Sequence, residues 1–269
     1  MPHLHVVGQQ LEYVWHGPAP ADAPTLVFLH EGLGCAAMWR DFPAQVAEAT
    51  GFGALVYSRA GYGDSSPITL PRTLRYLHDE ALKTLPQVLA ALDVREAILI
   101  GHSDGGSIAL IYAGSEHATP LRSVIVAAAH VFTEPITLAN VAATTALYVH
   151  GDLRAKLERY HGQNVDGAFW GWNRAWLDPA FEVWNIEDYL PAIRVPLLVI
   201  QGEADHYGTL RQVEAIQQGV AGTCQSLILP ECGHSPHRDQ PQLMLEAIKS
   251  FLHETADGNY LRHKRSDSE

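Results

Sequence analysis

The chain has 269 residues, of which 47% are hydrophobic and 18% are charged, a balance typical of a soluble globular protein and not of a disordered or membrane-spanning one. No apolar run approaches the roughly 20 residues that a transmembrane helix requires. The formal charge is −12, from 30 acidic and 18 basic residues. Because that field repels nucleic acids and anionic membranes, we expect neither as a partner and expect a small-molecule substrate instead.

The cysteines and the N-terminus indicate the compartment. Cys35, Cys224 and Cys232 are an odd number without metal-type spacing, so they predict neither a disulfide framework nor a metal site. The N-terminal residues lack the charged start and the apolar core of a signal peptide. We therefore expect a cytoplasmic protein, present as a monomer or a homodimer.

Short apolar runs bounded by turn residues recur along the chain and predict strands. A weak alternation over residues 3–15 predicts a hairpin at a sheet edge. Buried strands of a parallel sheet are then predicted, in chain order, at residues 25–30, 54–58, 97–101, 123–129, 196–202 and 226–229.

Helical periodicity occupies several of the intervals between these runs. Residues 74–92 predict a helix with a kink at Pro86, and residues 244–252 follow a 3.6-residue period. The apolar residues that share one face of the first helix are Leu74, Leu77, Ala81, Leu85, Val88 and Leu92. Strands that alternate with helices predict an α/β fold, in which a mainly parallel, twisted sheet has helices on both faces.

This alternation stops between residues 130 and 193, where no strand-like run appears and aromatic residues are frequent. The segment predicts a helical cap inserted into a single core, which residues 1–129 and 194–256 form. The polar residues 257–269, of mixed charge, predict a flexible C-terminal tail.

The strongest motif is GHSDG at residues 101–105, between the apolar run AILI and a helix-like stretch. A serine at such a strand-to-helix turn is typical of a nucleophile elbow, in which small neighbours permit a sharp turn. The start of the following helix stabilises developing negative charge. Ser103 is therefore the predicted nucleophile; the alternative is a helix-capping serine in a glycine-rich turn.

A nucleophilic serine needs a base, and the base needs an orienting acid. Asp205 follows the predicted strand at 196–202, and His234 follows the next one. The chain order of serine, aspartate and histidine at successive strand ends predicts a catalytic triad. His237 and Glu203 are the alternatives for base and acid: His237 is expected beside the site or at the surface, and Glu203 is expected to point away.

An oxyanion hole needs two backbone N–H groups directed at the developing negative charge. One is predicted to belong to Asp104, the residue after the nucleophile. The other is predicted in the loop HEGLG after the first buried strand, where Gly32 is the expected donor and Leu33 the alternative. Leu33 is also expected to face the substrate.

Together these motifs resemble the α/β-hydrolase fold family. FLHEGLG is similar to its oxyanion loop, SRAGYGDS to its D-x-R-G-x-G-x-S segment, and GHSDG, GEAD and CGHSPH to its catalytic motifs. The resemblance runs from the first buried strand to the last helix and is specific for fold, not for substrate. Two residues depart from the pattern: Glu31 replaces a glycine of the oxyanion loop, and Ser58 replaces an acid, a change expected to be structural.

Within that family, Ser-Asp-Gly at the elbow and a tryptophan-rich cap resemble biphenyl-hydrolase-like and valacyclovir-hydrolase-like serine esterases. The resemblance implies that Asp104 binds a substrate α-amino group; the alternatives are that Asp104 hydrogen-bonds nearby backbone or pairs with a protein arginine such as Arg59. Glu31 is a second carboxylate expected near the substrate. Trp170 represents the cap aromatics that could line an acyl pocket, although most are expected in the core.

The sequence thus predicts a serine hydrolase of a small carboxylic ester, thioester or lactone that uses no metal and no organic cofactor, since no such motif is present. One alternative uses the same triad for C–C bond hydrolysis or perhydrolysis. Another, from a different class, is a hydrolase-like protein that binds a ligand without turnover.

Overall fold

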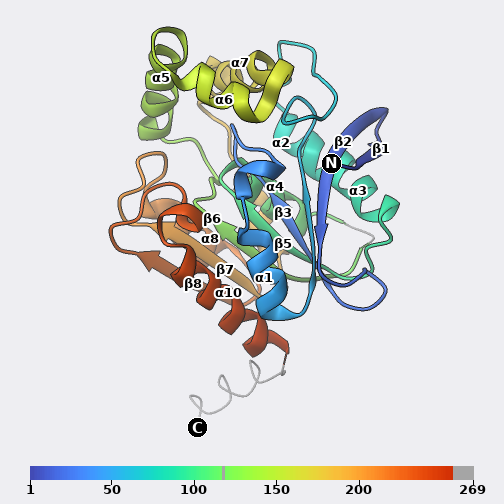
Figure 1. Ribbon diagram of the computed structural model, residues 1–269. Coiled ribbons are helices and arrows are strands. Elements are labelled where there is room, and N and C mark those ends of the chain that lie inside the picture. The colour runs from blue at the N-terminus through green and yellow to red at the C-terminus, as the bar shows by residue number, and fades with distance from the viewer. Residues whose placement is uncertain (117–118, 257–269) are drawn as a thin grey trace.

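In the computed structural model, which describes residues 1–116 and 119–256, eight strands of the described chain form one sheet in the order β1-β2-β4-β3-β5-β6-β7-β8 (Figure 1). The strands are β1 (His3–Val6), β2 (Gln9–His16), β3 (Thr25–Leu29), β4 (Gly53–Tyr57), β5 (Ala97–His102), β6 (Leu121–Ala127), β7 (Leu197–Gly202) and β8 (Cys224–Leu229). Strands β1 and β2 form an antiparallel hairpin at one edge, and β2 also pairs antiparallel with β4. Strands β3 to β8 pair in parallel. The predicted fold class is confirmed.

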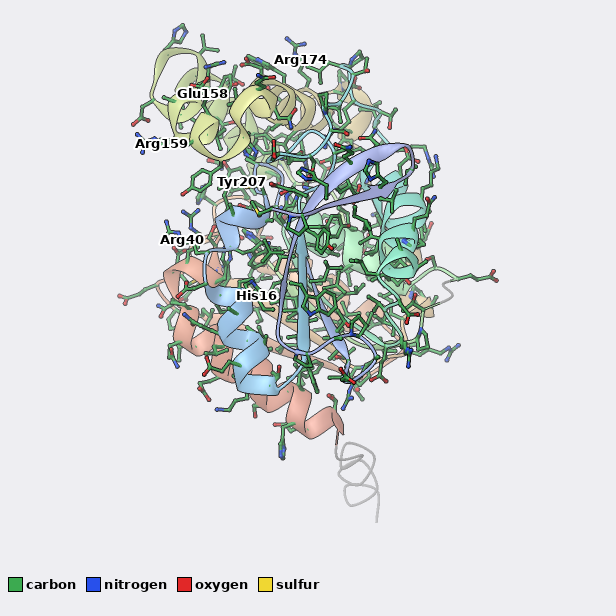
Figure 2. All side chains as sticks on the ribbon, turned by 45° about the vertical axis from the view of Figure 1, so that its right-hand side comes forward. His16, Arg40, Glu158, Arg159, Arg174 and Tyr207 are labelled. Atoms are coloured by element: carbon green, nitrogen blue, oxygen red, sulfur yellow. The ribbon has the colours of Figure 1, made fainter. Side chains whose placement is uncertain are left out.

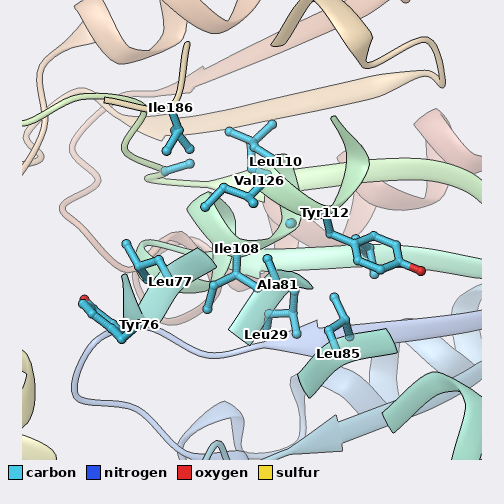
Figure 3. Close-up of a cluster of buried hydrophobic side chains, with 14 of the residues drawn as sticks. Leu29, Tyr76, Leu77, Ala81, Leu85, Ile108, Leu110, Tyr112, Val126 and Ile186 are labelled. Carbon is cyan, nitrogen blue, oxygen red and sulfur yellow. The ribbon is translucent and has the colours of Figure 1, made fainter. Parts of the chain in front are cut away.

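Helices cover both faces of the sheet. One face carries α2 (Tyr76–Asp79), α3 (Leu85–Ala91), α4 (Asp104–Ala113) and α8 (Leu210–Gly219), and the other carries α1 (Phe42–Thr50) and α10 (Pro241–Ala256). Alternate strand residues divide between the faces: Leu29 packs in the cluster drawn in Figure 3, whereas Phe28 packs with α1 and α10. Burial on both faces explains why the central strands are continuous apolar runs.

The predicted helix at residues 74–92 is divided into three parts. Helix α2 leads into a π-helical turn at Glu80–Thr84, and α3 begins at Leu85 with Pro86 in its first turn. A proline is tolerated there because the first N–H groups of a helix have no partner within the helix. The wider π turn therefore takes the place of the kink that the sequence predicted.

Residues 130–193 are mainly helical. They contain α5 (Pro135–His150), α6 (Leu153–His161) and α7 (Val165–Trp176), which gather at one end of the molecule in Figure 1, together with 3-10 turns at Gly162–Asn164, Pro179–Phe181 and Glu187–Ala192. Stacked rings join these elements, with centroids 3.6 Å apart for Tyr148 and Phe169. The division into a core and a cap stays a prediction, and the predicted tail at 257–269 lies outside the described residues.

Two further short helices lie near the catalytic motifs, a 3-10 turn at Ala36–Trp39 and α9 (Pro236–Asp239). No helix within residues 1–116 and 119–256 has the length and apolar character needed to cross a membrane.

Candidate active site

Ser103 lies in the turn between β5 and α4, with a backbone φ of +52°. Such an angle is rare for a residue other than glycine and is typical of a sharp, functionally constrained turn. The turn is closely packed: a Cβ atom on Gly101 would overlap the backbone of Gly105, and one on Gly105 would overlap the backbone of Leu29. These positions therefore require glycine, and the sequence GHSDG folds as the strand–turn–helix that the motif predicted.

His234 and Asp205 come from the loops after β8 and β7 and meet Ser103. The Ser103 Oγ atom is 3.0 Å from Nε2 of His234, and Nδ1 of His234 is 2.9 Å from each carboxylate oxygen of Asp205. When Nδ1–H donates to Asp205, Nε2 is the acceptor for the serine hydroxyl. The structure thus brings together the three residues that the sequence placed in a triad.

Asp205 is held by further donors. Gln201 Nε2 donates to one carboxylate oxygen at 2.7 Å, and the backbone N–H of Tyr207 donates to the other at 2.8 Å. Burial alone would raise the pKa of Asp205, but its hydrogen bonds, chiefly with His234, hold that pKa at about 2. Burial lowers the pKa of His234, an effect that Asp205 opposes. At neutral pH the pair is an ionised carboxylate beside a neutral imidazole.

The two alternatives for base and acid lie elsewhere. His237 is buried, not at the surface, and its ring packs 4.5 Å from that of Trp39 and 5.0 Å from that of His102. Glu203 is exposed. Neither contacts Ser103 among the described hydrogen bonds.

A cavity of about 90 Å³ lies against Ser103 and His234, and its walls include Glu31, Gly32, Leu33 and Asp104. Asp104 is the first residue of α4, where backbone N–H groups have no partner within the helix. A Cβ atom on Gly32 would overlap the indole of Trp172, so the loop comes close to that side chain only because the residue is glycine. Both predicted donor segments thus border the cavity, while the oxyanion assignment stays a prediction.

The Asp104 carboxylate is fully buried and is bonded to protein groups. The Tyr76 hydroxyl donates to it at 2.6 Å, Trp176 Nε1 donates at 3.2 Å, and Arg59 Nη1 is 3.9 Å away. Of the two positive partners that the sequence left open, a substrate ammonium and Arg59, the protein supplies Arg59. Arg59 therefore already balances the negative charge of the carboxylate. This arrangement favours the alternative in which Asp104 has a structural role and does not bind a substrate amine.

Glu31 also has a partner of its own. Its Oε2 atom is 3.4 Å from Nδ1 of His102, whose Nε2 donates to the backbone carbonyl of His234 at 2.6 Å. Burial opposes ionisation of Glu31, but the hydrogen bond and charge of His102 lower its pKa well below the usual range. Burial also opposes protonation of His102, yet Glu31 raises the pKa of that imidazole. The pair thus joins the oxyanion loop to the loop of the base.

Ser58, which replaces an acid of the family pattern, bonds to an acid from the neighbouring strand. Its hydroxyl donates to Glu12 at 2.5 Å and accepts from the backbone N–H of Ala36 at 2.9 Å. Glu12 is 1% exposed. The serine therefore has the structural role that was expected, with the carboxylate supplied by β2.

The prediction for Trp170 is wrong. Trp170 is half-buried, packs beside Phe169 and carries the Arg174 guanidinium over its ring, and it is not part of the cavity wall. The tryptophans that line the cavity are Trp172 and Trp176. Two positions along a helix turn a side chain by about 200°, which places Trp170 on the other face of α7. The four-residue spacing of Trp172 and Trp176 was the available signal.

Sequence reasoning also missed other residues of the cavity wall, namely His130, Thr137, Val141 and Tyr207. Tyr207 lies where the helices of residues 130–193 meet the rest of the protein, whereas Glu158 and Arg174 lie farther out on those helices (Figure 2). The ring of Tyr207 is 4.7 Å from that of His234. Of the four missed residues, His130 and Tyr207 follow strand ends and Thr137 and Val141 belong to α5, and none of them lies in a recognisable motif.

The sheet order, the turn at Ser103 and the residues that meet there define an α/β-fold hydrolase. The chain belongs to the alpha/beta hydrolase family, whose family model matches residues 26–247. It is 26% identical to the carboxylesterase YbfK of Bacillus subtilis over 87% of this chain and 81% of that protein. It is also 26% identical to 3-oxoadipate enol-lactonase 1 of Acinetobacter baylyi, over 87% of this chain and 90% of the other.

Solved structures share the fold. The enol-lactonase from Burkholderia xenovorans LB400 superposes with a TM-score of 0.73 at 22% identity, covering 94% of this chain and 100% of that one. The esterase EaEST from Exiguobacterium antarcticum superposes with a TM-score of 0.75 at 21% identity, covering 93% and 98%. The narrower resemblance to biphenyl-hydrolase-like esterases stays a prediction.

Proposed function

We propose that the protein hydrolyses a small carboxylic ester, thioester or lactone through an acyl-enzyme on Ser103. The observation that carries the proposal is the continuous contact from Ser103 Oγ through the His234 imidazole to the Asp205 carboxylate. A neutral histidine between a hydroxyl and an ionised carboxylate is the arrangement that activates a serine. Relatives named as a carboxylesterase and an enol-lactonase support ester and lactone substrates.

In the first half of the reaction, Ser103 Oγ forms a bond to the carbonyl carbon while its proton passes to Nε2 of His234. The tetrahedral intermediate then collapses, and the same proton passes to the departing oxygen or sulfur. In the second half, water gives a proton to His234 and attacks the acyl-enzyme. The carbon–Oγ bond breaks, the proton returns to Oγ, and the carboxylic acid leaves.

Asp205 stabilises the imidazolium that forms in both halves, because it is ionised at neutral pH and contacts Nδ1. The negative charge on the carbonyl oxygen is assigned to the backbone N–H groups of Asp104 and of Gly32 or Leu33, which border the cavity.

The cavity also supports a limit on substrate size. Its volume is about 90 Å³, and one water molecule in the liquid occupies about 30 Å³. A short acyl or alcohol portion therefore fits better than a long chain, and the surrounding tryptophans Trp172 and Trp176 provide an apolar wall.

The test is the hydrolysis of p-nitrophenyl acetate, butyrate and octanoate by the wild type and by Ser103→Ala. We expect the short esters to be the best substrates and Ser103→Ala to lose kcat by a factor on the order of 10⁶. Ser115→Ala, two residues after the end of α4, is the control and should retain activity. Near-normal turnover by a folded Ser103→Ala protein would overturn the proposal.

A further inference from the structure

His130 is a residue of the cavity wall to which the proposed mechanism gives no task. It follows β6 and lines the same cavity as Ser103 and His234. The side chain is nearly fully buried, with 2% of its surface exposed. Its ring lies 6.0 Å from the ring of His234 and 5.3 Å from that of Trp176. An imidazole that holds this position borders both the base and the space where a substrate binds.

The imidazole of His130 has an unused hydrogen-bonding nitrogen. Within residues 1–116 and 119–256, Nδ1 is buried and has no hydrogen-bond partner. Buried nitrogens of His78 and His237 share this property, but these two side chains are not part of the cavity wall. A buried polar atom without a partner costs about 1–3 kcal/mol. Nδ1 has almost no accessible surface and lies beside Gly208, so a ligand in the cavity would bond to the other ring nitrogen, Nε2, which also has no hydrogen-bond partner among the described residues.

The backbone holds His130 in place independently of its ring. Ser107 Oγ donates to the carbonyl of His130 at 2.6 Å, and the next backbone N–H, of Val131, donates to Gln212 at 2.8 Å. A Cβ atom on Gly208 would lie 3.3 Å from the ring, so the imidazole is also packed from that side. Among the described residues, the ring is therefore held in position without a hydrogen bond to its nitrogens.

The charge state of His130 decides which ligand group suits it. Burial, helped by the nearby His234, lowers the pKa of His130 to about 3, although Asp205 and Glu134 oppose the shift. The ring is therefore neutral at neutral pH and offers one N–H donor and one nitrogen acceptor. A hydroxyl group can pair with Nε2 whether that nitrogen donates or accepts, whereas a carboxylate or an ammonium would have to enter a buried site beside a neutral partner.

We propose that His130 is a specificity-determining residue that forms a hydrogen bond with a hydroxyl group of the substrate, one or two carbons from the scissile ester. The substrate class is then a short hydroxy ester. This inference rests on the proposed ester hydrolysis at Ser103, since both concern the same cavity. A site built to bind a hydroxyl discriminates strongly against the analogue that lacks it, because its own polar group is left without a partner.

The experiment compares isosteric ester pairs in a pH-stat assay. Methyl hydroxyacetate and methyl propionate place the hydroxyl on the acyl side, and 2-hydroxyethyl acetate and propyl acetate place it on the alcohol side. The variants are His130→Phe, which keeps a ring but removes both nitrogens, and His130→Asn, which keeps a donor and an acceptor. Thermal unfolding is measured for each variant.

In one of the two pairs, we expect His130→Phe to lower kcat/KM for the hydroxylated ester by at least about tenfold more than for its isostere, with partial recovery in His130→Asn. The pair that responds identifies the side of the ester that carries the hydroxyl. Equal losses within both pairs would overturn the inference and leave His130 as a packing residue. Failure of the proposed function gives a different result, since the wild type would then turn over none of the four esters.

A second measurement does not depend on the folding of the phenylalanine variant. In Ser103→Ala protein labelled with ¹⁵N-histidine, methyl hydroxyacetate should shift an imidazole resonance that is missing from the His130→Asn double variant. Methyl propionate should leave that resonance in place. A shift of equal size with both esters would contradict a hydrogen bond to the hydroxyl.

Discussion

Replacing Asp104 by asparagine distinguishes a structural carboxylate from one that binds a substrate amine. The change removes the negative charge 3.9 Å from Arg59, which is 3% exposed. Breaking a buried ion pair from one side costs about 3–5 kcal/mol, because the remaining charge is buried without compensation. Glu80 also interacts electrostatically with Arg59, but burial raises the pKa of Glu80, so that carboxyl group does not fully compensate the Arg59 charge. The distance of 3.9 Å between Arg59 Nη1 and the Asp104 carboxylate exceeds that of a direct hydrogen bond. We therefore expect Asp104→Asn to lower the free energy of unfolding by about 3 kcal/mol, the lower end of that range.

The assay is urea unfolding of the wild type, Asp104→Asn and the control Asp79→Asn. Asp79 forms a 2.7 Å ion pair with Lys83, but the Lys83 side chain is 66% exposed and that of Asp79 is 34% exposed, so loss of the pair should change the free energy of unfolding by less than about 1 kcal/mol. The second readout is the ratio of kcat/KM for an α-amino ester to that for its N-acetyl analogue. We expect Asp104→Asn to leave this ratio unchanged.

Two results would refute the structural assignment of Asp104. One is an unfolding free energy of Asp104→Asn equal to that of the wild type. The other is a selective loss of activity toward the α-amino ester, by the roughly 1.5–3 kcal/mol that a hydrogen bond to a charged group contributes. The amino-ester specificity implied by the family resemblance would then be correct.

Two further predictions concern the base and the cavity. His234 must be neutral to accept the serine proton, and burial lowers its pKa below the usual 6.5. We therefore expect kcat/KM for an uncharged ester to rise with pH to a plateau, with a midpoint below about pH 6.5. A midpoint above pH 7 would contradict this prediction. Trp172 lines the cavity and Trp170 does not. We therefore expect Trp172→Ala to raise kcat/KM for longer acyl chains relative to shorter ones by about fourfold per methylene, from about 0.8 kcal/mol per buried CH₂, and Trp170→Ala to keep the wild-type ratio. Equal shifts in the two variants would contradict the assignment of the cavity wall.

The sequence predicts the sheet well for a physical reason. Parallel strands buried on both faces must be continuous apolar runs, as at Thr25–Leu29 and Ala97–His102. The positions of Ser103, Asp205 and His234 follow from the same fact. Each lies in the segment that follows a strand, Ser103 immediately after β5 and the other two in the loops after β7 and β8, and the carboxyl ends of parallel strands lie at one edge of the sheet.

Contacts between distant segments could not be predicted in this way. The partners of Asp104 are Arg59, Tyr76 and Trp176, which lie on three elements that only tertiary packing brings together. The Glu31–His102 pair joins the oxyanion loop to the end of β5, two segments whose motifs were recognised separately. Trp170 was misplaced because the aromatic composition of α7 shows that a helix is buried, whereas its register decides which tryptophan faces the cavity.

Labelling with a fluorophosphonate tests most directly the claim that Ser103 is the nucleophile activated by His234. The reagent forms a stable bond to an activated serine, and peptide mass mapping identifies the modified residue. We expect one adduct in the wild type, on Ser103, that appears as esterase activity disappears, and no adduct in Ser103→Ala; His234→Ala should label far more slowly. An adduct on another residue that accounts for the loss of activity, or undiminished labelling of Ser103→Ala, would contradict the account.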